Sequence, residues 1–170
     1  MPRLQISVVT RYENNRGNVD NVHNLAADEL STRIVDYIDI SNDALPEHKY
    51  KENEDPKHVK SLKTSRGPLL NKWQDSSNPI MCSYKIVRVK FEVWGLQTRV
   101  ESYAQKTIRD VLLLAHRQAF AWTDEWYDLS YEKIVEYERE TYARTNDKVL
   151  LNNSIHDNNN NDLEEEENKN

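Results

Sequence analysis

Two polar residues stand at the ends of apolar rows in segments that alternate as β-strands do. The rows are Leu4, Ile6 and Val8 in residues 4–12, and Val87, Val89, Phe91 and Val93 in residues 82–94. Thr10 continues the first row and Lys85 has the parity of the second. A hydroxyl and an ammonium bind anionic oxygens, so the pattern predicts a cavity with an apolar floor and a phosphate at one end. In the alternative, Lys85 lies at a strand end and its stem carries the ammonium to water.

A carboxylate interrupts another apolar row, in a helical segment. Tyr131, Val135, Glu138 and Tyr142 recur at three- and four-residue spacing and fall on one stripe of a helix. Glu138 is therefore a candidate binding residue on a stripe that should face inward. The alternative is a solvated flank, which is the usual position of a glutamate.

The segment KSLKTSRGPL (60–69) mixes bases with hydroxyls. Its bases are Lys60, Lys63 and Arg66, and its hydroxyls belong to Ser61, Thr64 and Ser65. The favoured interpretation is a solvated loop. The functional alternative is phosphorylation, with the added charge pairing with the nearby bases.

The other reactive side chains show no catalytic or metal-binding spacing. Five histidines are scattered, at positions 23, 48, 58, 116 and 156, and Cys82 is the single cysteine. A lone cysteine at a strand start is typical of a small buried hydrophobe, and it excludes an internal disulfide. Three glycines do not make a phosphate-binding loop. We expect no metal, no cofactor and no enzymatic activity.

Local periodicity predicts the elements that position these residues, in an α+β fold. Strands are predicted over 4–12, 34–40 and 82–94, and a short helix over 26–34. A long amphipathic helix follows from about Leu96 to Trp126, and a second, capped by Ser130, runs to about Arg144. The side chains of the long helix predicted to face away from the core are Glu101, Lys106, Arg109, Asp110 and Arg117.

Two segments fall outside this regular pattern. Residues 41–82 form an irregular connection of a length that is usually functional. Between the last strand and the long helix, KFEVWGLQ places Trp94 and Leu96 at a corner beside a glycine. Large apolar residues at such a corner either pack into the core or contact something outside the protein.

Composition divides the chain into one domain, 1–151, and an Asn/Glu-rich tail, 152–170, which we expect to be disordered. The tail holds six acids and one lysine, so most of the net charge of −6 belongs to it. The near-neutral domain argues against nucleic-acid binding. The single cysteine fits a reducing compartment, and no run approaches the length of a membrane span. We expect a soluble intracellular protein with peripheral membrane contact only.

Four stretches carry a resemblance to a known family. They are VDYIDI, KYKENEDPKHVKSLKTSRGPLLNKW, MCSYKIVRVKFEVWGLQTRVE and HRQAFAWTDEWYDLSYEKIVEYERET. From about Leu4 to Thr141 the chain resembles the class I phosphatidylinositol transfer proteins. The resemblance implies a START-like cup, in which a curved antiparallel sheet and long helices surround one phospholipid. It also implies transfer of phosphatidylinositol and phosphatidylcholine between membranes without covalent chemistry, by a cytoplasmic monomer that visits membrane surfaces.

The resemblance also implies roles for particular residues. Thr10 and Lys85 match residues that contact the lipid phosphate, Glu138 matches an acidic residue needed for phosphatidylinositol, and Ser61 matches a phosphorylatable serine. The corner matches a membrane-docking tip that has two adjacent tryptophans in the family. Here the first of them is Val93, so we expect Val93, Trp94 and Leu96 to bind the membrane more weakly than the family's tip does.

The chain departs from the family pattern at its N-terminal side. Family members carry roughly a hundred further residues upstream, about the size of a small domain. We therefore expect the N-terminal part of the fold to be missing. This keeps a second hypothesis open, a truncated membrane-docking or interaction fragment that transfers no lipid.

Overall fold

The computed structural model describes the backbone of residues 4–167 and the side chains of residues 4–150. It divides into two compact units, Met1–Glu125 and Trp126–Asn170, which are considered separately below. The first unit contains the strands β1 (Leu4–Glu13) and β2 (Cys82–Phe91) and the helices α1 (Ala27–Thr32), α2 (Trp73–Ser76) and α3 (Gln97–Ala121). Short 3₁₀ turns occupy Glu47–Lys49 and Glu52–Glu54, and α4 (Thr123–Trp126) follows α3. The second unit contains α5 (Tyr131–Glu167).

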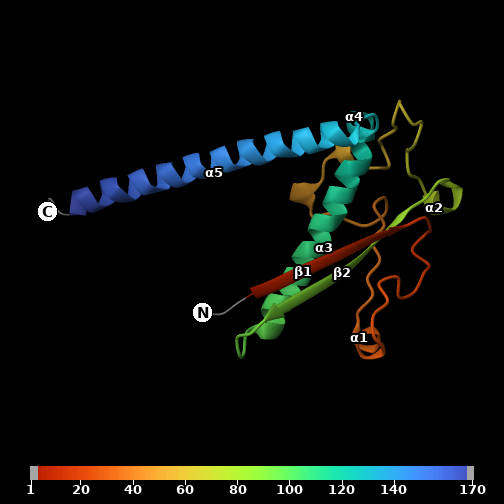
Figure 1. Ribbon diagram of the computed structural model, residues 1–170, viewed down its shortest axis with the longest axis horizontal. Coiled ribbons are helices and arrows are strands. Elements are labelled where there is room, and N and C mark those ends of the chain that lie inside the picture. The colour runs from red at the N-terminus through yellow and green to blue at the C-terminus, as the bar shows by residue number, and fades with distance from the viewer. Residues whose placement is uncertain (1–3, 168–170) are drawn as a thin grey trace. The chain divides into compact units, whose positions relative to one another are not determined.

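The two strands form an antiparallel pair along their whole length (Figure 1). Leu4 lies opposite Phe91, Val8 opposite Val87 and Thr10 opposite Lys85. Because directly opposed residues share a face, Leu4, Ile6 and Val8 lie on one face of the sheet with Val87, Val89 and Phe91. The strand ends at Phe91 rather than at residue 94, so Val93 of the predicted row lies outside it. The other face contacts the segment after β1, where the Arg88 guanidinium binds Glu29 of α1.

The predicted strand 34–40 is wrong, since residues 33–39 have no strand structure. The Asp39 carboxylate accepts the backbone N–H groups of Ser41 and Asn42, at 2.9 and 3.1 Å, and so closes a turn. Hydrogen bonds from α3 engage the backbone carbonyls of Tyr37 and Ile40, which a neighbouring strand would otherwise occupy. The apolar alternation of VDYIDI therefore reflects an extended segment lying on a helix.

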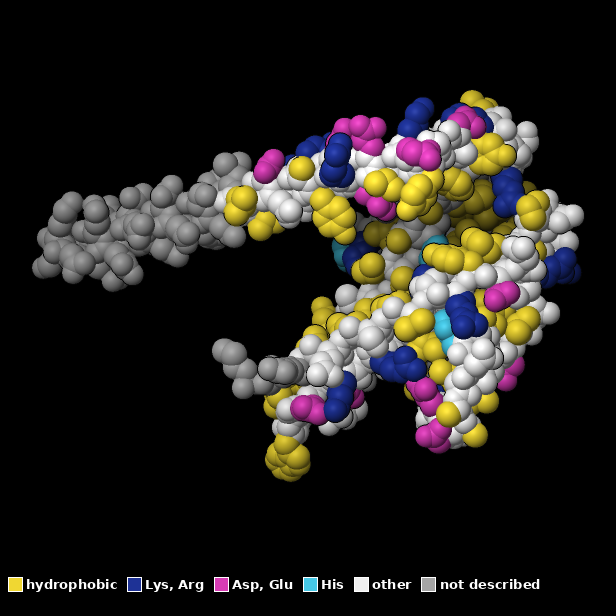
Figure 2. Space-filling view, viewed as in Figure 1, with side chains coloured by type: hydrophobic (Ala, Val, Ile, Leu, Met, Phe, Trp, Pro, Cys, Tyr) yellow, Lys and Arg dark blue, Asp and Glu magenta, His cyan; other side chains and the backbone are white. Residues whose placement is uncertain are grey.

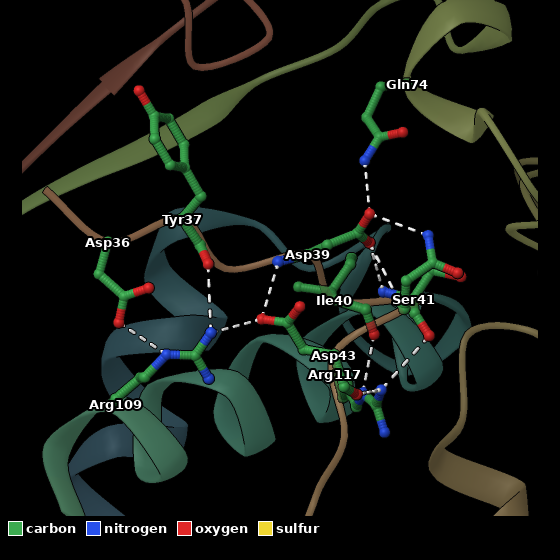
Figure 3. Close-up of polar contacts among 10 residues, drawn as sticks. Asp36, Tyr37, Asp39, Ile40, Ser41, Asp43, Gln74, Arg109 and Arg117 are labelled. Carbon is green, nitrogen blue, oxygen red and sulfur yellow. Dashed lines mark hydrogen bonds and ion pairs between the residues drawn. The ribbon is translucent and has the colours of Figure 1, made fainter. Parts of the chain in front are cut away.

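Two arginines of α3 make these contacts, so the prediction that both face away from the core is wrong (Figure 3). Arg109 binds the carboxylates of Asp36 and Asp43, each at 2.7 Å. Arg117 is 3% exposed and donates to the backbone carbonyls of Ile40, Ser41 and Asp43. An arginine satisfied by carbonyl oxygens can be buried at a helical position that otherwise looks polar.

The long helix α3 is shorter than predicted, and the residues that it buries differ from the predicted apolar stripe. It ends at Ala121, because Trp122 leaves the helical conformation (φ −92°, ψ 21°), and a separate turn, α4, follows. Its buried residues are Ala104, Leu113 and Arg117. The irregular connection adds two further buried apolar side chains, those of Pro56 and Leu69. The helix packs against β2 and so positions the sheet.

After residues 126–130, the described part of the second unit is the single helix α5. It begins at Tyr131 as predicted, but continues to Glu167 rather than ending near Arg144. Its side chains from Tyr131 to Leu150 are exposed, so the stripe through Glu138 is not buried. The predicted disorder of 152–170 stays a prediction, since the side chains of 151–170 and the backbone of 168–170 lie outside the described residues. None of the helices, over the residues described, is long and apolar enough to cross a membrane.

Candidate functional site

Lys85 and Thr10 face one another across the strand pair. They are 75 residues apart in the sequence, but the register of β1 and β2 makes them direct partners, and Lys85 Nζ donates to Thr10 Oγ1 at 3.2 Å. Both side chains are half-buried. The structure thus brings together the two residues that the sequence selected independently, at the end of the shared apolar face.

Lys85 is a cation with no neutralising acid beside it among the described side chains. Its Nζ lies 5.6 Å from the centre of the Tyr12 ring, a distance at which an aromatic face attracts a cation. Among the described side chains, no carboxylate lies within ion-pair distance of Lys85. Burial lowers the pKa of His116 on α3 from 6.5, and the charge of Lys85 lowers it further. The positive charge at this point of the sheet is suited to an anionic group.

The apolar rows beside this pair remain accessible. Leu4, Ile6 and Val8 are each 47% exposed, on the face that carries Lys85 and Thr10. Figure 2 shows hydrophobic side chains exposed on the first unit. An apolar surface that ends in a cation matches a ligand with a hydrocarbon part and an anionic part.

The corner between β2 and α3 presents its tryptophan to solvent. Trp94 is 99% exposed, Leu96 is half-exposed and Val93 is partly covered. The turn is ordered by hydrogen bonds, since the carbonyl of Val93 accepts the N–H groups of Leu96 and Gln97, at 3.2 and 3.1 Å. Gly95 adopts a φ of +81°, in the left-handed region that favours glycine. The tight turn therefore projects the indole away from the first unit.

Ser61 lies in a packed loop, so the favoured interpretation of 60–69 as solvated is wrong at this residue. It is 5% exposed, and its hydroxyl donates to the Asp124 carboxylate of α4. The same carboxylate accepts the N–H groups of Leu62 and Lys63, at 2.7 and 3.1 Å. The hydrogen bond from Ser61, followed by those from the Leu62 and Lys63 N–H groups, lowers the pKa of Asp124 below its ordinary value. The bases Lys60, Lys63 and Arg66 are exposed, as a solvated loop predicts.

Sequence reasoning missed Asp124 and Ser83. Asp124 carries no local signal, because its partners lie more than sixty residues away. Ser83 lies two residues before Lys85 on the same face of β2, opposite Tyr12, and this alternation could be read from the strand pattern.

The remaining candidate residues give no sign of catalysis or metal binding. Burial raises the pKa of the Cys82 thiol, which disfavours the thiolate. No group of three or more potential metal ligands occurs among the described residues. Glu138 belongs to the second unit, where it is exposed on α5.

Comparison with known proteins identifies similar sequences. The profile of the phosphatidylinositol transfer protein family matches residues 1–143. The cytoplasmic phosphatidylinositol transfer protein 1 of Mus musculus and that of Homo sapiens are each 54% identical over 149 residues, covering 88% of this chain and 45% of the relative. The protein of the same name from Drosophila melanogaster is 50% identical, with 88% and 55% covered. The chain thus spans about half the length of these relatives.

Proposed function

Because the chain belongs to the phosphatidylinositol transfer protein family, we propose that it binds phosphatidylinositol and moves it between membranes. The observation that carries the proposal is the Lys85–Thr10 pair at the end of an exposed apolar sheet face. In this proposal the pair binds the lipid phosphate and the apolar rows contact the acyl chains. The relatives' names support phosphatidylinositol as cargo.

The proposed fold around the lipid is a START-like cup. Shielding hydrocarbon from water is worth roughly 0.8 kcal/mol per CH₂ group. A carrier therefore gains from enclosing both chains, and the curved sheet and long helices of the family pattern serve this purpose. Phosphatidylcholine has the same phosphate and chains and is proposed as a second cargo. The bound lipid is cargo, and no cofactor takes part.

Docking is proposed to occur through the corner at Val93, Trp94 and Leu96. An exposed indole beside leucine suits the headgroup level of a bilayer, where one end of the ring is apolar and the other can hydrogen-bond. We place the protein in the cytoplasm as a monomer that visits membranes transiently, without nucleic acid as a partner. A second candidate, favoured by the full exposure of Trp94, is membrane docking without transfer.

Two further residues receive roles in this proposal. Glu138 discriminates phosphatidylinositol from phosphatidylcholine through its carboxylate, which can accept hydrogen bonds from inositol hydroxyls. Ser61 is a phosphorylation site that acts by opening its loop. Its hydroxyl is bound to Asp124, so an added phosphate would meet a like charge and would have to leave the buried position.

The test is transfer of labelled phosphatidylinositol and phosphatidylcholine between vesicles. Lys85→Ala should reduce transfer of both lipids about tenfold or more, because a charge-assisted contact is lost. The matched control is Lys90→Ala, on the same strand but the opposite face, which should leave transfer unchanged. Glu138→Ala should reduce phosphatidylinositol transfer selectively. Vesicle binding by the unmodified chain with no transfer of either lipid would favour the docking alternative.

A further inference from the structure

One hydroxyl near the Lys85–Thr10 pair is buried without a partner. Ser83 Oγ is inaccessible to solvent and makes no hydrogen bond, the one such side-chain atom among the described residues. Leaving a buried hydroxyl unsatisfied is unfavourable, and such groups in native proteins usually have a water, an ion or a ligand as their partner. The orphaned hydroxyl therefore points to a group that is bound at this place.

The position of Ser83 identifies that group. Ser83 lies opposite Tyr12, and the adjacent pair on the same face is Thr10 with Lys85. Residues two apart on one strand are roughly 7 Å apart, a span that a phosphate and its two donors can bridge. Rotation about χ1 moves a serine hydroxyl between three staggered positions without moving the strand. The Ser83 hydroxyl can thus turn toward an anion held at Lys85.

The charges around this position favour an anion. Lys85 has a hydroxyl and an aromatic ring as its described contacts, and neither neutralises the ammonium. His116, from the helix packed against β2, has its pKa lowered by burial and by Lys85, so at neutral pH the ammonium is the charge that a ligand meets. The phosphate of a phosphodiester accepts hydrogen bonds but has no O–H to donate, and a serine hydroxyl can supply it with one more donor.

We propose that Ser83 is a third ligand to the phosphate group bound by Lys85 and Thr10, and that this group is the phosphodiester of a glycerophospholipid. The inference rests on the proposed function, which places a lipid phosphate at this pair. It adds a residue that sets how tightly the phosphate is held. The same chemistry would bind free phosphate, so the test separates the two sources.

The experiment compares Ser83→Thr with Ser83→Val in the full chain. The two side chains have nearly the same shape, but only threonine keeps the hydroxyl, so packing changes are matched. Binding is measured with fluorescent phosphatidylinositol in phosphatidylcholine vesicles. We expect the valine variant to bind the labelled lipid about tenfold more weakly than the threonine variant, the value of one hydrogen bond to a charged group. The corresponding pair Ser7→Thr and Ser7→Val, on the opposite face of β1, should show no difference.

A stability measurement separates ligand binding from a structural role. Without lipid, Ser83→Val should unfold at a temperature equal to or above that of Ser83→Thr, because it removes an unsatisfied hydroxyl. A valine variant that is less stable without lipid, with equal binding of lipid, would overturn the inference. If both larger side chains prevent folding, Ser83→Ala against the unmodified chain gives the same comparison.

The remaining outcomes distinguish the inference from the function on which it rests. If Lys85→Ala loses lipid while the two Ser83 variants bind equally, Ser83 is no ligand and the proposed function stands. If the unmodified chain binds no labelled lipid, both are wrong. Inorganic phosphate should not displace the lipid at concentrations well above that of the protein. Displacement that depends on the Ser83 hydroxyl would assign the site to free phosphate and overturn its assignment to a phospholipid.

Discussion

Two turns of the first unit each contain a glycine in the left-handed conformation, yet they do opposite things. Gly67 has a φ of +85° and Gly95 a φ of +81°. A Cβ on Gly67 would lie 2.3 Å from the Val59 carbonyl oxygen, whereas a Cβ on Gly95 would meet nothing within 4 Å. The first turn belongs to a loop folded inward around Ser61, and the second projects Trp94 outward. The same backbone conformation serves internal packing in one place and surface presentation in the other.

The largest difference should appear when alanine replaces each glycine. Gly67→Ala combines an unfavourable φ with a collision against backbone, so it should lower the free energy of unfolding by about 3 kcal/mol. Gly95→Ala carries the conformational cost alone, about 1 kcal/mol. Chemical denaturation of both variants measures the difference. Equal losses would mean that the Gly67 loop is not held against Val59.

The two turns should also differ in their sensitivity to low pH. The pKa of Asp124 is lowered because its carboxylate accepts hydrogen bonds from Ser61, Leu62 and Lys63, so the carboxylate stabilises the loop above its ordinary pKa of 3.8. That stabilisation is lost as pH falls through the lowered pKa, where the carboxylate is protonated. Amide hydrogen exchange should show Leu62 and Lys63 losing protection in this range while the Val93–Gln97 turn does not.

Asp124→Asn should lower the protection of the Leu62 and Lys63 amides from hydrogen exchange already at neutral pH, and it should remove the dependence of that protection on acid. Glu125→Gln, at the neighbouring exposed position, is the control and should change neither amide. Parallel loss of protection in both turns would contradict a specific contact between Asp124 and the Ser61 loop.

The smallest effect on stability is expected when the exposed apolar residue of each loop is replaced by alanine. The two replacements should nevertheless differ in their effect on vesicle binding. Trp94 is 99% exposed and Leu62 is 89% exposed. Neither Trp94→Ala nor Leu62→Ala should change stability, because neither side chain is buried. Trp94→Ala should weaken vesicle binding about tenfold, the value of one interfacial aromatic anchor. Leu62→Ala should not, and similar losses in a vesicle sedimentation assay would show that exposure alone decides docking.

Much of the fold near the sheet was predictable because its signals are local. Strand parity placed Thr10 and Lys85 on one face with the apolar rows, and the register then made them partners. The short helix after β1 and the start of α5 also followed from periodicity and from the serine before the helix.

The parts that could not be predicted depend on contacts between distant residues. VDYIDI has the alternation of a strand, but arginines more than seventy residues later bind its carbonyl groups. Ser61 lies in a basic, polar stretch, yet it is buried and donates a hydrogen bond to Asp124, which is 63 residues away. A periodicity argument assigns polar residues to the solvent side of a helix. It cannot show that an arginine will be buried with its N–H groups bound to backbone carbonyls, as Arg117 is.

Native mass spectrometry of the purified chain, without added lipid, tests the central claim most directly. The chain should carry one phospholipid per molecule, identified by fragmentation as phosphatidylinositol or phosphatidylcholine, and Lys85→Ala should lose it while Lys90→Ala retains it. A lipid-free chain, or equal retention by the two lysine variants, would contradict the account of a phospholipid held by its phosphate at Lys85.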